Sequence, residues 1–180
     1  LALLELEIAA TKRGMRSSAV IVLDVDGLKF VNDSLGHQAG DELIRTVART
    51  LAGRLRASDA IARLGGDEFA VLLCLLPGDD AREIAGRIVA AVETPVPVDG
   101  GSALVGASVG IALSAAGRDD DGEALLREAD HAMYAVKRAG KGSFAVARSD
   151  AVADVRAQFQ FTDVDLQSCA SELFGVTKLS

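Results

Sequence analysis

One stretch constrains the fold more than any other: Arg63-Leu-Gly-Gly-Asp-Glu-Phe-Ala-Val-Leu-Leu73. Apolar runs flank Gly65 and Gly66, which is typical of two short strands joined by a tight turn, because only glycine adopts positive φ without steric cost. Two carboxylates, Asp67 and Glu68, follow the turn at once. Such a turn can hold a phosphate through a metal ion, but acidic residues are also common in solvated turns. Taken alone, the motif favours the solvated turn.

Short apolar runs and amphipathic helical patterns alternate along the rest of the chain. Their order is strand, helix, hairpin, helix, strand, helix, strand, and its first part is the β-α-β-β-α-β pattern of a ferredoxin-like fold. We therefore expect an α+β domain of palm type, with an antiparallel-rich central sheet, an extra helix and strand, and helices on one side. Strands are predicted at 19–23, 60–64, 68–76, 103–113 and 143–147, and helices at 28–35, 41–55, 84–92 and 125–139.

Residues 1–147 are expected to form one domain, and residues 148–180 a tail or linker of unknown role. Residues 1–12 have the spacing of the end of an amphipathic helix. The chain does not begin with Met, so we expect a fragment, truncated at its N-terminus, of a larger protein that carries a sensor or other domain.

Charge and cysteine content narrow the class of protein. The formal net charge of −7 argues against a binder of DNA or RNA, although local basic residues and a divalent ion would still admit a nucleotide. No apolar run reaches the roughly 18–20 residues of a membrane span. Two distant cysteines, Cys74 and Cys169, form no C-x-x-C pattern and indicate a reducing, cytoplasmic setting. The chain is expected to be cytoplasmic, alone or as the cytosolic part of a membrane-anchored protein.

Three carboxylates are expected to meet at one end of the sheet. In the predicted topology, Asp24 follows the first strand and comes close to Asp67 and Glu68 at the hairpin turn. Three such groups repel one another unless a cation joins them, and oxygen-only ligands suit Mg²⁺ or Mn²⁺ rather than zinc. Mg²⁺ typically binds carboxylates together with substrate phosphates, so a nucleoside triphosphate is the natural ligand. Two such ions can serve a phosphoryl transfer.

Several blocks in order carry a family resemblance. Besides Gly65–Phe69, they are Asp24-Val-Asp-Gly-Leu-Lys-Phe-Val-Asn-Asp33, Gly36-His-Gln-Ala-Gly-Asp-Glu-Leu43, Ser108-Val-Gly-Ile-Ala112 and Ala129-Asp-His-Ala-Met-Tyr-Ala-Val-Lys137 with Ala139-Gly-Lys141. Together they resemble a GGDEF-type diguanylate cyclase domain over residues 19–147. The resemblance implies that a homodimer condenses two GTP molecules, one per subunit, to cyclic di-GMP and two pyrophosphates.

The resemblance also implies roles for individual residues. Asp24 and Glu68, with the main-chain carbonyl of Val25, would hold Mg²⁺ or Mn²⁺, as two ions per site. Asp67 would be a further metal ligand or the base that takes the 3′-hydroxyl proton, and both roles stay open. The remaining substrate contacts would come from glycines that let the backbone approach, guanine-reading side chains and phosphate-binding lysines: Gly65, Gly66, Asn32, Asp41, Lys29, Lys137 and Lys141.

Plainer roles remain open for some of these residues. Asp41 could be only the N-cap of its helix, and Asn32-Asp33 could be a polar turn. Lys137 and Lys141 could be solvated cations at a helix C-terminus. Asp26 is expected to brace its loop rather than bind metal.

An inhibitory site is indicated by Arg56-Ala-Ser-Asp59, which resembles the family's R-x-x-D site for the product and starts nine residues before Gly65. Arginine can grip phosphate through two N–H groups and stack on guanine. Arg87 is the second arginine expected there. The alternative is an ordinary Arg–Asp pair at a helix end.

The chain departs from the family pattern in places: the Asp-x-Leu-Thr and Asn-Arg entry segment is missing, and Leu28 stands where an aromatic is common. The main rival hypothesis is a catalytically silent module that binds GTP or cyclic di-GMP and regulates an attached domain. Asp24, Asp67 and Glu68 favour the enzyme over this rival. Another palm-like nucleotidyltransferase is a second rival, against which Asn32 and Asp41 argue.

Overall fold

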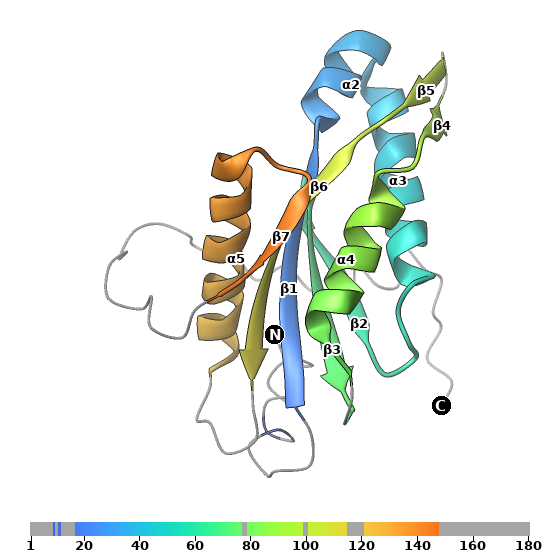
Figure 1. Ribbon diagram of the computed structural model, residues 1–180. Helices are drawn as coiled ribbons and strands as arrows, with labels where there is room; N and C mark the ends of the chain where they lie inside the picture. The colour runs from blue at the N-terminus through green and yellow to red at the C-terminus, as the bar shows by residue number, and fades with distance from the viewer. Residues whose placement is uncertain are drawn as a thin grey trace.

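A five-stranded sheet forms the centre of the protein (Figure 1). The computed structural model describes residues 9, 11, 17–76, 79–98, 101–114 and 121–147. The strand order is β2-β3-β1-β6-β7, antiparallel except for the parallel β6–β7 pair. The order of four of these strands, β2-β3-β1-β6, is that of a ferredoxin-like fold, which confirms the expected α+β architecture. The strands are β1 (Ser17–Asp26), β2 (Ala60–Gly65), β3 (Glu68–Leu75), β6 (Gly106–Ser114) and β7 (Ser143–Val146).

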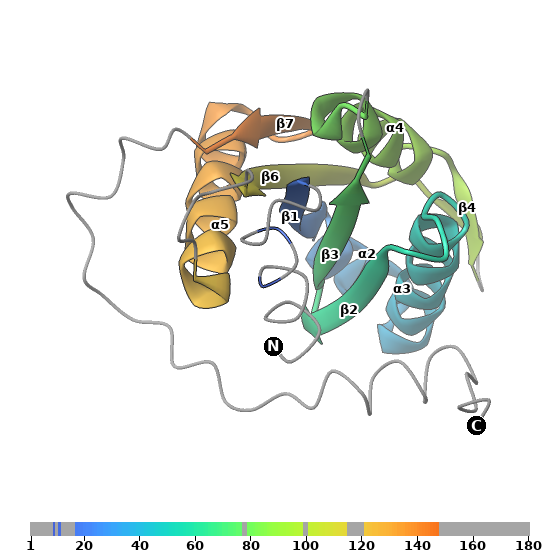
Figure 2. The ribbon, with the colours of Figure 1, turned by 90° about the horizontal axis from the view of Figure 1, so that it is seen from below.

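Helices cover both faces of the sheet, so the expectation of helices on one side was wrong. Helices α3 and α4 lie over one face and α5 over the other (Figure 2), while α2 lies beyond the end of β1 (Figure 1). The reason is that β1 is buried along both faces, as continuous apolar strands are. The helices are α2 (Leu28–Leu35), α3 (His37–Ala52), α4 (Ala81–Val92) and α5 (Gly122–Ala139).

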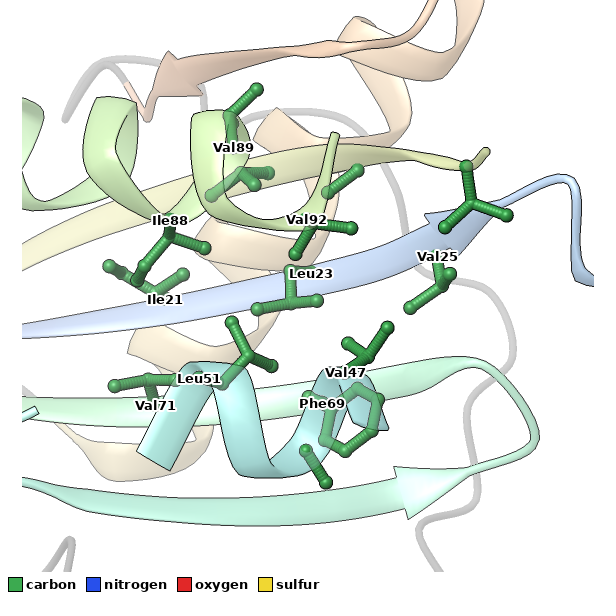
Figure 3. Packing of buried hydrophobic residues seen from close by; sticks show 14 of the residues in the cluster. Ile21, Leu23, Val25, Val47, Leu51, Phe69, Val71, Ile88, Val89 and Val92 are labelled. Carbon is green, nitrogen blue, oxygen red and sulfur yellow. The ribbon is translucent and has the colours of Figure 1, made fainter. Parts of the chain in front are cut away.

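Alternate residues of β1 enter two different cores because successive strand side chains point to opposite faces. Figure 3 shows Ile21, Leu23 and Val25 in the larger core, between α3, α4 and β3. Val20 and Val22 enter a smaller core beneath α5. Partners in the larger core include Val47, Leu51, Phe69, Val71, Ile88 and Val92, and those in the smaller include Leu125, Ala129 and Met133.

Helix α5 lies directly on the backbone of β6 at Gly110. A Cβ atom at this position would overlap the main-chain oxygen of Ala129 and the main-chain nitrogen of Met133. Glycine is therefore required at this contact for steric reasons, and the contact sets the position of the helix that carries Lys137.

Several predicted boundaries were wrong. Strand β1 continues beyond Leu23 to Asp26, because Asp24 and Asp26 still pair with β6 and Asp24 also pairs with β3. Helix α3 begins at His37, directly after Gly36 with φ 88°, so Asp41 is inside the helix and is not its N-cap.

A small hairpin was missed: β4 (Val96–Val98) pairs with β5 (Gly101–Ala103). The strand predicted from 103 begins at Gly106 instead. The helix expected at residues 1–12 falls outside the described residues except at 9 and 11, and the tail at 148–180 falls wholly outside them. No helix in the described part of the chain has the length and apolar character to cross a bilayer.

Candidate active site

The end of β1 and the β2–β3 turn bring two carboxylates together. Asp24 on β1 is the register partner of Glu68 on β3. The main-chain N–H of Val25 donates to the main-chain oxygen of Asp67 at 3.0 Å, so the turn is tied to the end of β1. The C-terminal end of α5 reaches the same end of the sheet as the junction of β1 with α2 (Figure 1). The expected neighbourhood of the hairpin turn and the first strand is confirmed.

The Gly65-Gly66 turn is open on its outer side and held from within. Gly66 has φ 52°, in the left-handed region, and a Cβ added to either glycine would meet nothing within 4 Å. The Arg63 guanidinium donates through Nε and Nη2 to the carbonyl of Gly66, at 3.0 and 2.6 Å. Sequence reasoning gave Arg63 no role, although its position just before the turn was a signal. The turn therefore offers space for a ligand and keeps a defined shape.

Burial opposes the negative charges at this end of the sheet. Asp24 is only 6% exposed. Burial raises its pKa, and the charges of Asp67 and Asp26 add to the rise, while Lys137 acts against it. Burial is also the main reason why the pKa of Glu68 is raised, with Asp24 contributing. The ionised carboxylates therefore need a cation.

Lys137 supplies that cation in the structure. Its Nζ lies 2.7 Å from Oδ2 of Asp24, and its side chain is 27% exposed. Burial disfavours the ammonium, but the bond to Asp24 and the charges of Glu68 and Asp67 outweigh this, so the pKa of Lys137 is raised. The alternative of a solvated helix-end cation is therefore wrong for Lys137, which faces the carboxylates.

The donor set suits a hard divalent ion. It contains carboxylate oxygens of Asp24 and Glu68 with Asp67 nearby, and oxygen ligands are those that Mg²⁺ and Mn²⁺ prefer. The described residues contain no group of three His, Cys, Asp or Glu side chains already arranged around a metal position. An ion would have to displace the Lys137 ammonium and draw the acids inward.

Asp26 and Lys141 form a separate contact beside this site. Asp26 accepts hydrogen bonds from Oγ of Ser108, at 2.9 and 3.1 Å, and from the main-chain N–H of Gly142 at 3.3 Å. Nζ of Lys141 lies 3.8 Å from Asp26, and Lys141 has φ 68°. Asp26 thus braces the turn between α5 and β7, and it holds Lys141 at this end of the sheet.

The predicted guanine-reading residues lie on α2 and α3. A Cβ at Gly40 would overlap the side-chain amide oxygen of Asn32, so Asn32 packs against the residue that precedes Asp41. Asn32 is within α2, which makes the polar-turn alternative wrong. Asp41 and Lys29 are exposed. The structure therefore places the side chain of Asn32 against Gly40, the residue before Asp41.

A second cluster surrounds the Arg56-Ala-Ser-Asp59 turn. Both carboxylate oxygens of Asp59 accept main-chain N–H groups, from Arg56 at 2.9 Å and Cys74 at 3.2 Å. The guanidinium of Arg56 instead pairs with Asp79, through bonds of 2.6 and 2.9 Å. The cap of α4 is the next residue, Asp80, which accepts from the N–H of Arg82. The ordinary pair within the motif is therefore absent, and Arg56 has a partner that the sequence did not suggest.

Asp130 on α5 was also missed. It is half-buried, and burial raises its pKa, while its charge raises the pKa of Glu68. It lies within the family-like block Ala129–Lys137, of which only Lys137 was predicted to belong to the site.

The palm-type sheet with acids on neighbouring strands defines the class of domain, and comparison with known proteins gives its family. A family profile described as "Diguanylate cyclase, GGDEF domain" matches residues 2–143. The chain belongs to the GGDEF family.

One relative, TpbB, illustrates this membership both in sequence and in structure. Diguanylate cyclase TpbB of Pseudomonas aeruginosa PAO1 is 46% identical over 127 residues, which are 69% of this chain and 29% of TpbB. The crystal structure of the GGDEF domain of PA1120 (YfiN or TpbB) has a TM-score of 0.76 at 41% identity, covering 82% of this chain and 92% of that one. The matched region is thus less than a third of the length of TpbB.

A third similarity includes a ligand. The GGDEF domain of DgcB from Caulobacter crescentus, solved in complex with c-di-GMP, has a TM-score of 0.72 at 28% identity. That alignment covers 80% of this chain and 85% of the DgcB domain.

Proposed function

We propose that this domain is a diguanylate cyclase, which condenses two GTP molecules to cyclic di-GMP and two pyrophosphates. The observation that carries the proposal is the register pairing of Asp24 with Glu68 beside the open Gly65-Gly66 turn, with Lys137 bonded to Asp24. Membership of the GGDEF family and similarity to TpbB support it.

The substrate phosphates bind at the turn and the end of α5. The backbone at Gly65 and Gly66 leaves room for them. Lys137 gives up its bond to Asp24 and binds a phosphate oxygen instead, once another cation neutralises Asp24. Lys29 and Lys141 add further positive charge near the phosphates. Asn32 and Asp41 read the guanine edge through amide and carboxylate groups.

Asp24, Glu68 and the Val25 carbonyl would hold two divalent ions, Mg²⁺ or Mn²⁺. When bound, such ions neutralise phosphate charge and activate the attacking oxygen. Raised pKa values of Asp24 and Glu68 support this role, because a cation relieves the cost of ionising buried acids. Asp67 is a further ligand or the base that takes the hydroxyl proton.

Two phosphodiester bonds form in each molecule of product, each by the same chemical step. The 3′-oxygen of one GTP bonds to the α-phosphorus of the other, and the bond from that phosphorus to the bridging oxygen of pyrophosphate breaks. The hydroxyl proton leaves to a base, for which Asp67 is the candidate. One turn can serve only one such bond, so the enzyme works as a homodimer with its two GTP sites facing each other.

Arg56, Asp59 and Arg87 form a separate site at which the product inhibits the enzyme. The Arg56 guanidinium projects from the loop after α3 and is 53% exposed, which makes it accessible to a phosphate. Asp59 shapes the turn that presents it.

The domain, residues 1–147 of this chain, works in the cytoplasm as part of a longer protein. A sensor or other domain of that protein controls the pairing of the two sites. Residues 148–180 act as the tail or linker of this arrangement. The fraction of TpbB that the chain spans supports a multidomain protein.

The test is to incubate the purified chain, and a longer form with its neighbouring domains, with GTP and Mg²⁺. Cyclic di-GMP is expected by chromatography, and its formation should stop with a chelator. Binding of GTP without any product from the longer form would favour the silent regulatory module instead.

A further inference from the structure

The guanidinium of Arg56 is engaged by a carboxylate of the same chain. Nη1 and Nη2 of Arg56 donate to the two oxygens of Asp79 at 2.6 and 2.9 Å. This is the parallel, two-bond geometry in which arginine also binds a phosphate. A phosphate and Asp79 therefore need the same two N–H groups.

Asp79 is held in place to make this contact. Its Oδ2 also accepts the main-chain N–H of Leu76 at 2.9 Å, and its own N–H donates to the carbonyl of Leu76 at 3.0 Å. Its side chain is 16% exposed, against 53% for Arg56. The bond from Arg56, then that from Leu76, lowers the pKa of Asp79, so the carboxylate is charged at neutral pH.

The other acid of the cluster does not compete for the guanidinium. Asp59 uses its two oxygens for the main-chain N–H groups of Arg56 and Cys74. Arg87 on α4 acts on Asp79 as well, since its charge contributes to the lowered pKa of Asp79. Arg56 thus bonds to this carboxylate and Arg87 interacts with it through its charge, so removing the carboxylate would leave the Arg56 guanidinium for an external anion.

We propose that Asp79 is an intramolecular competitor of cyclic di-GMP, which must displace it from Arg56 to inhibit the enzyme. The inference rests on the inhibitory site proposed above. Asp79 raises the product concentration at which inhibition sets in.

Asp79→Asn tests the competition directly. The amide keeps the shape of the side chain and an acceptor for the N–H of Leu76, but it loses the charge. Asp80→Asn is the matched control: it removes the same charge one residue away, and asparagine caps a helix as well as aspartate does. Arg56→Ala, alone and combined with Asp79→Asn, removes the anion-binding group.

Calorimetric titration with cyclic di-GMP gives the dissociation constant for each variant. Asp79→Asn should lower it about fivefold, the scale of a solvent-exposed ion pair, with Asp80→Asn within about twofold of wild type. When Arg56→Ala is also present, Asp79→Asn should no longer lower the dissociation constant. The product concentration that halves the initial rate should fall in parallel in Asp79→Asn, while the rate without product stays unchanged.

The outcomes separate the two proposals. Binding that does not depend on Arg56, or no binding in any variant, overturns the inhibitory site and with it the competition. Arg56-dependent binding that is unchanged or weakened in Asp79→Asn overturns the competition alone. Equal tightening in Asp80→Asn also overturns it, because net charge would then explain the effect. Thermal unfolding of each variant confirms that the comparison is between folded proteins.

Discussion

Replacing Gly110 by alanine should separate α5 from the sheet. The added Cβ would overlap two main-chain atoms, the oxygen of Ala129 and the nitrogen of Met133. Neither can rotate away as a flexible side chain would, so the whole helix has to shift. Overpacking of a core costs about 1–3 kcal/mol and sometimes more, and a clash with backbone belongs at the upper end. We expect a loss of about 3 kcal/mol or more, a large part of the roughly 5–15 kcal/mol that holds a domain together.

Gly86→Ala is the matched control. Gly86 is also buried in part, but its added Cβ would have only Cε1 of Phe144 as a neighbour, at the ordinary distance of 3.7 Å. Since Gly86 lies inside α4, alanine there should be neutral or stabilise by about 0.5–1 kcal/mol.

Urea unfolding followed by circular dichroism measures both variants. If Gly110→Ala unfolds, Met133→Ala as a second change will not restore it, because the clash involves main-chain atoms. A variant within about 0.5 kcal/mol of wild type would refute the close contact between α5 and β6. The position of Lys137 above Asp24 would then lose its structural basis.

Three further predictions concern the site itself. Mg²⁺ should raise the melting temperature at neutral pH, and this effect should disappear as the pH falls and Asp24 and Glu68 take up protons. Because their pKa values are raised, the effect should disappear at a higher pH than the one at which ordinary carboxylates take up protons. The pKa values of Asp24 and Glu68 are raised in the folded state, so ionising them costs stability as the pH rises, and the ion offsets that cost. An Mg²⁺ effect that is the same at pH 4 and pH 8 would contradict this. Gly40→Ala should weaken GTP binding about tenfold by displacing the amide of Asn32, as measured by calorimetry, with Gly86→Ala as control; unchanged affinity would remove Asn32 from the nucleotide site. Arg63→Ala should lower kcat about tenfold, on the scale of a lost charged hydrogen bond, by releasing the carbonyl of Gly66; full activity would show that the turn keeps its shape without Arg63.

The hairpin and the order of the elements could be predicted because each local pattern agreed with the next. The run Ala19–Leu23, however, is apolar throughout, so it does not show which residues of β1 face which of the two cores. The helix at 125–139 was predicted, but for this reason its place on the second face of the sheet was not. Asp24 and Asp26 were expected to lie beyond the end of the strand, and the pairing with β3 and β6 shows that both belong to it.

The site residues were predicted from motifs, but their partners could not be. Lys137 was expected to contact phosphate, and its bond to Asp24 depends on how α5 crosses the sheet at Gly110. Asp79 is 23 residues from Arg56 and belongs to no shared motif. Such contacts depend on tertiary structure, which local sequence patterns do not specify.

The chemistry of the paired sites is tested most directly by product analysis of wild type, Glu68→Gln and their equimolar mixture, each incubated with GTP and Mg²⁺. Wild type should yield cyclic di-GMP, and Glu68→Gln should bind GTP but form no phosphodiester bond. The mixture should in addition accumulate the linear dinucleotide pppGpG, because a mixed dimer completes one bond of the two. Wild-type yields of cyclic di-GMP from Glu68→Gln would contradict the account.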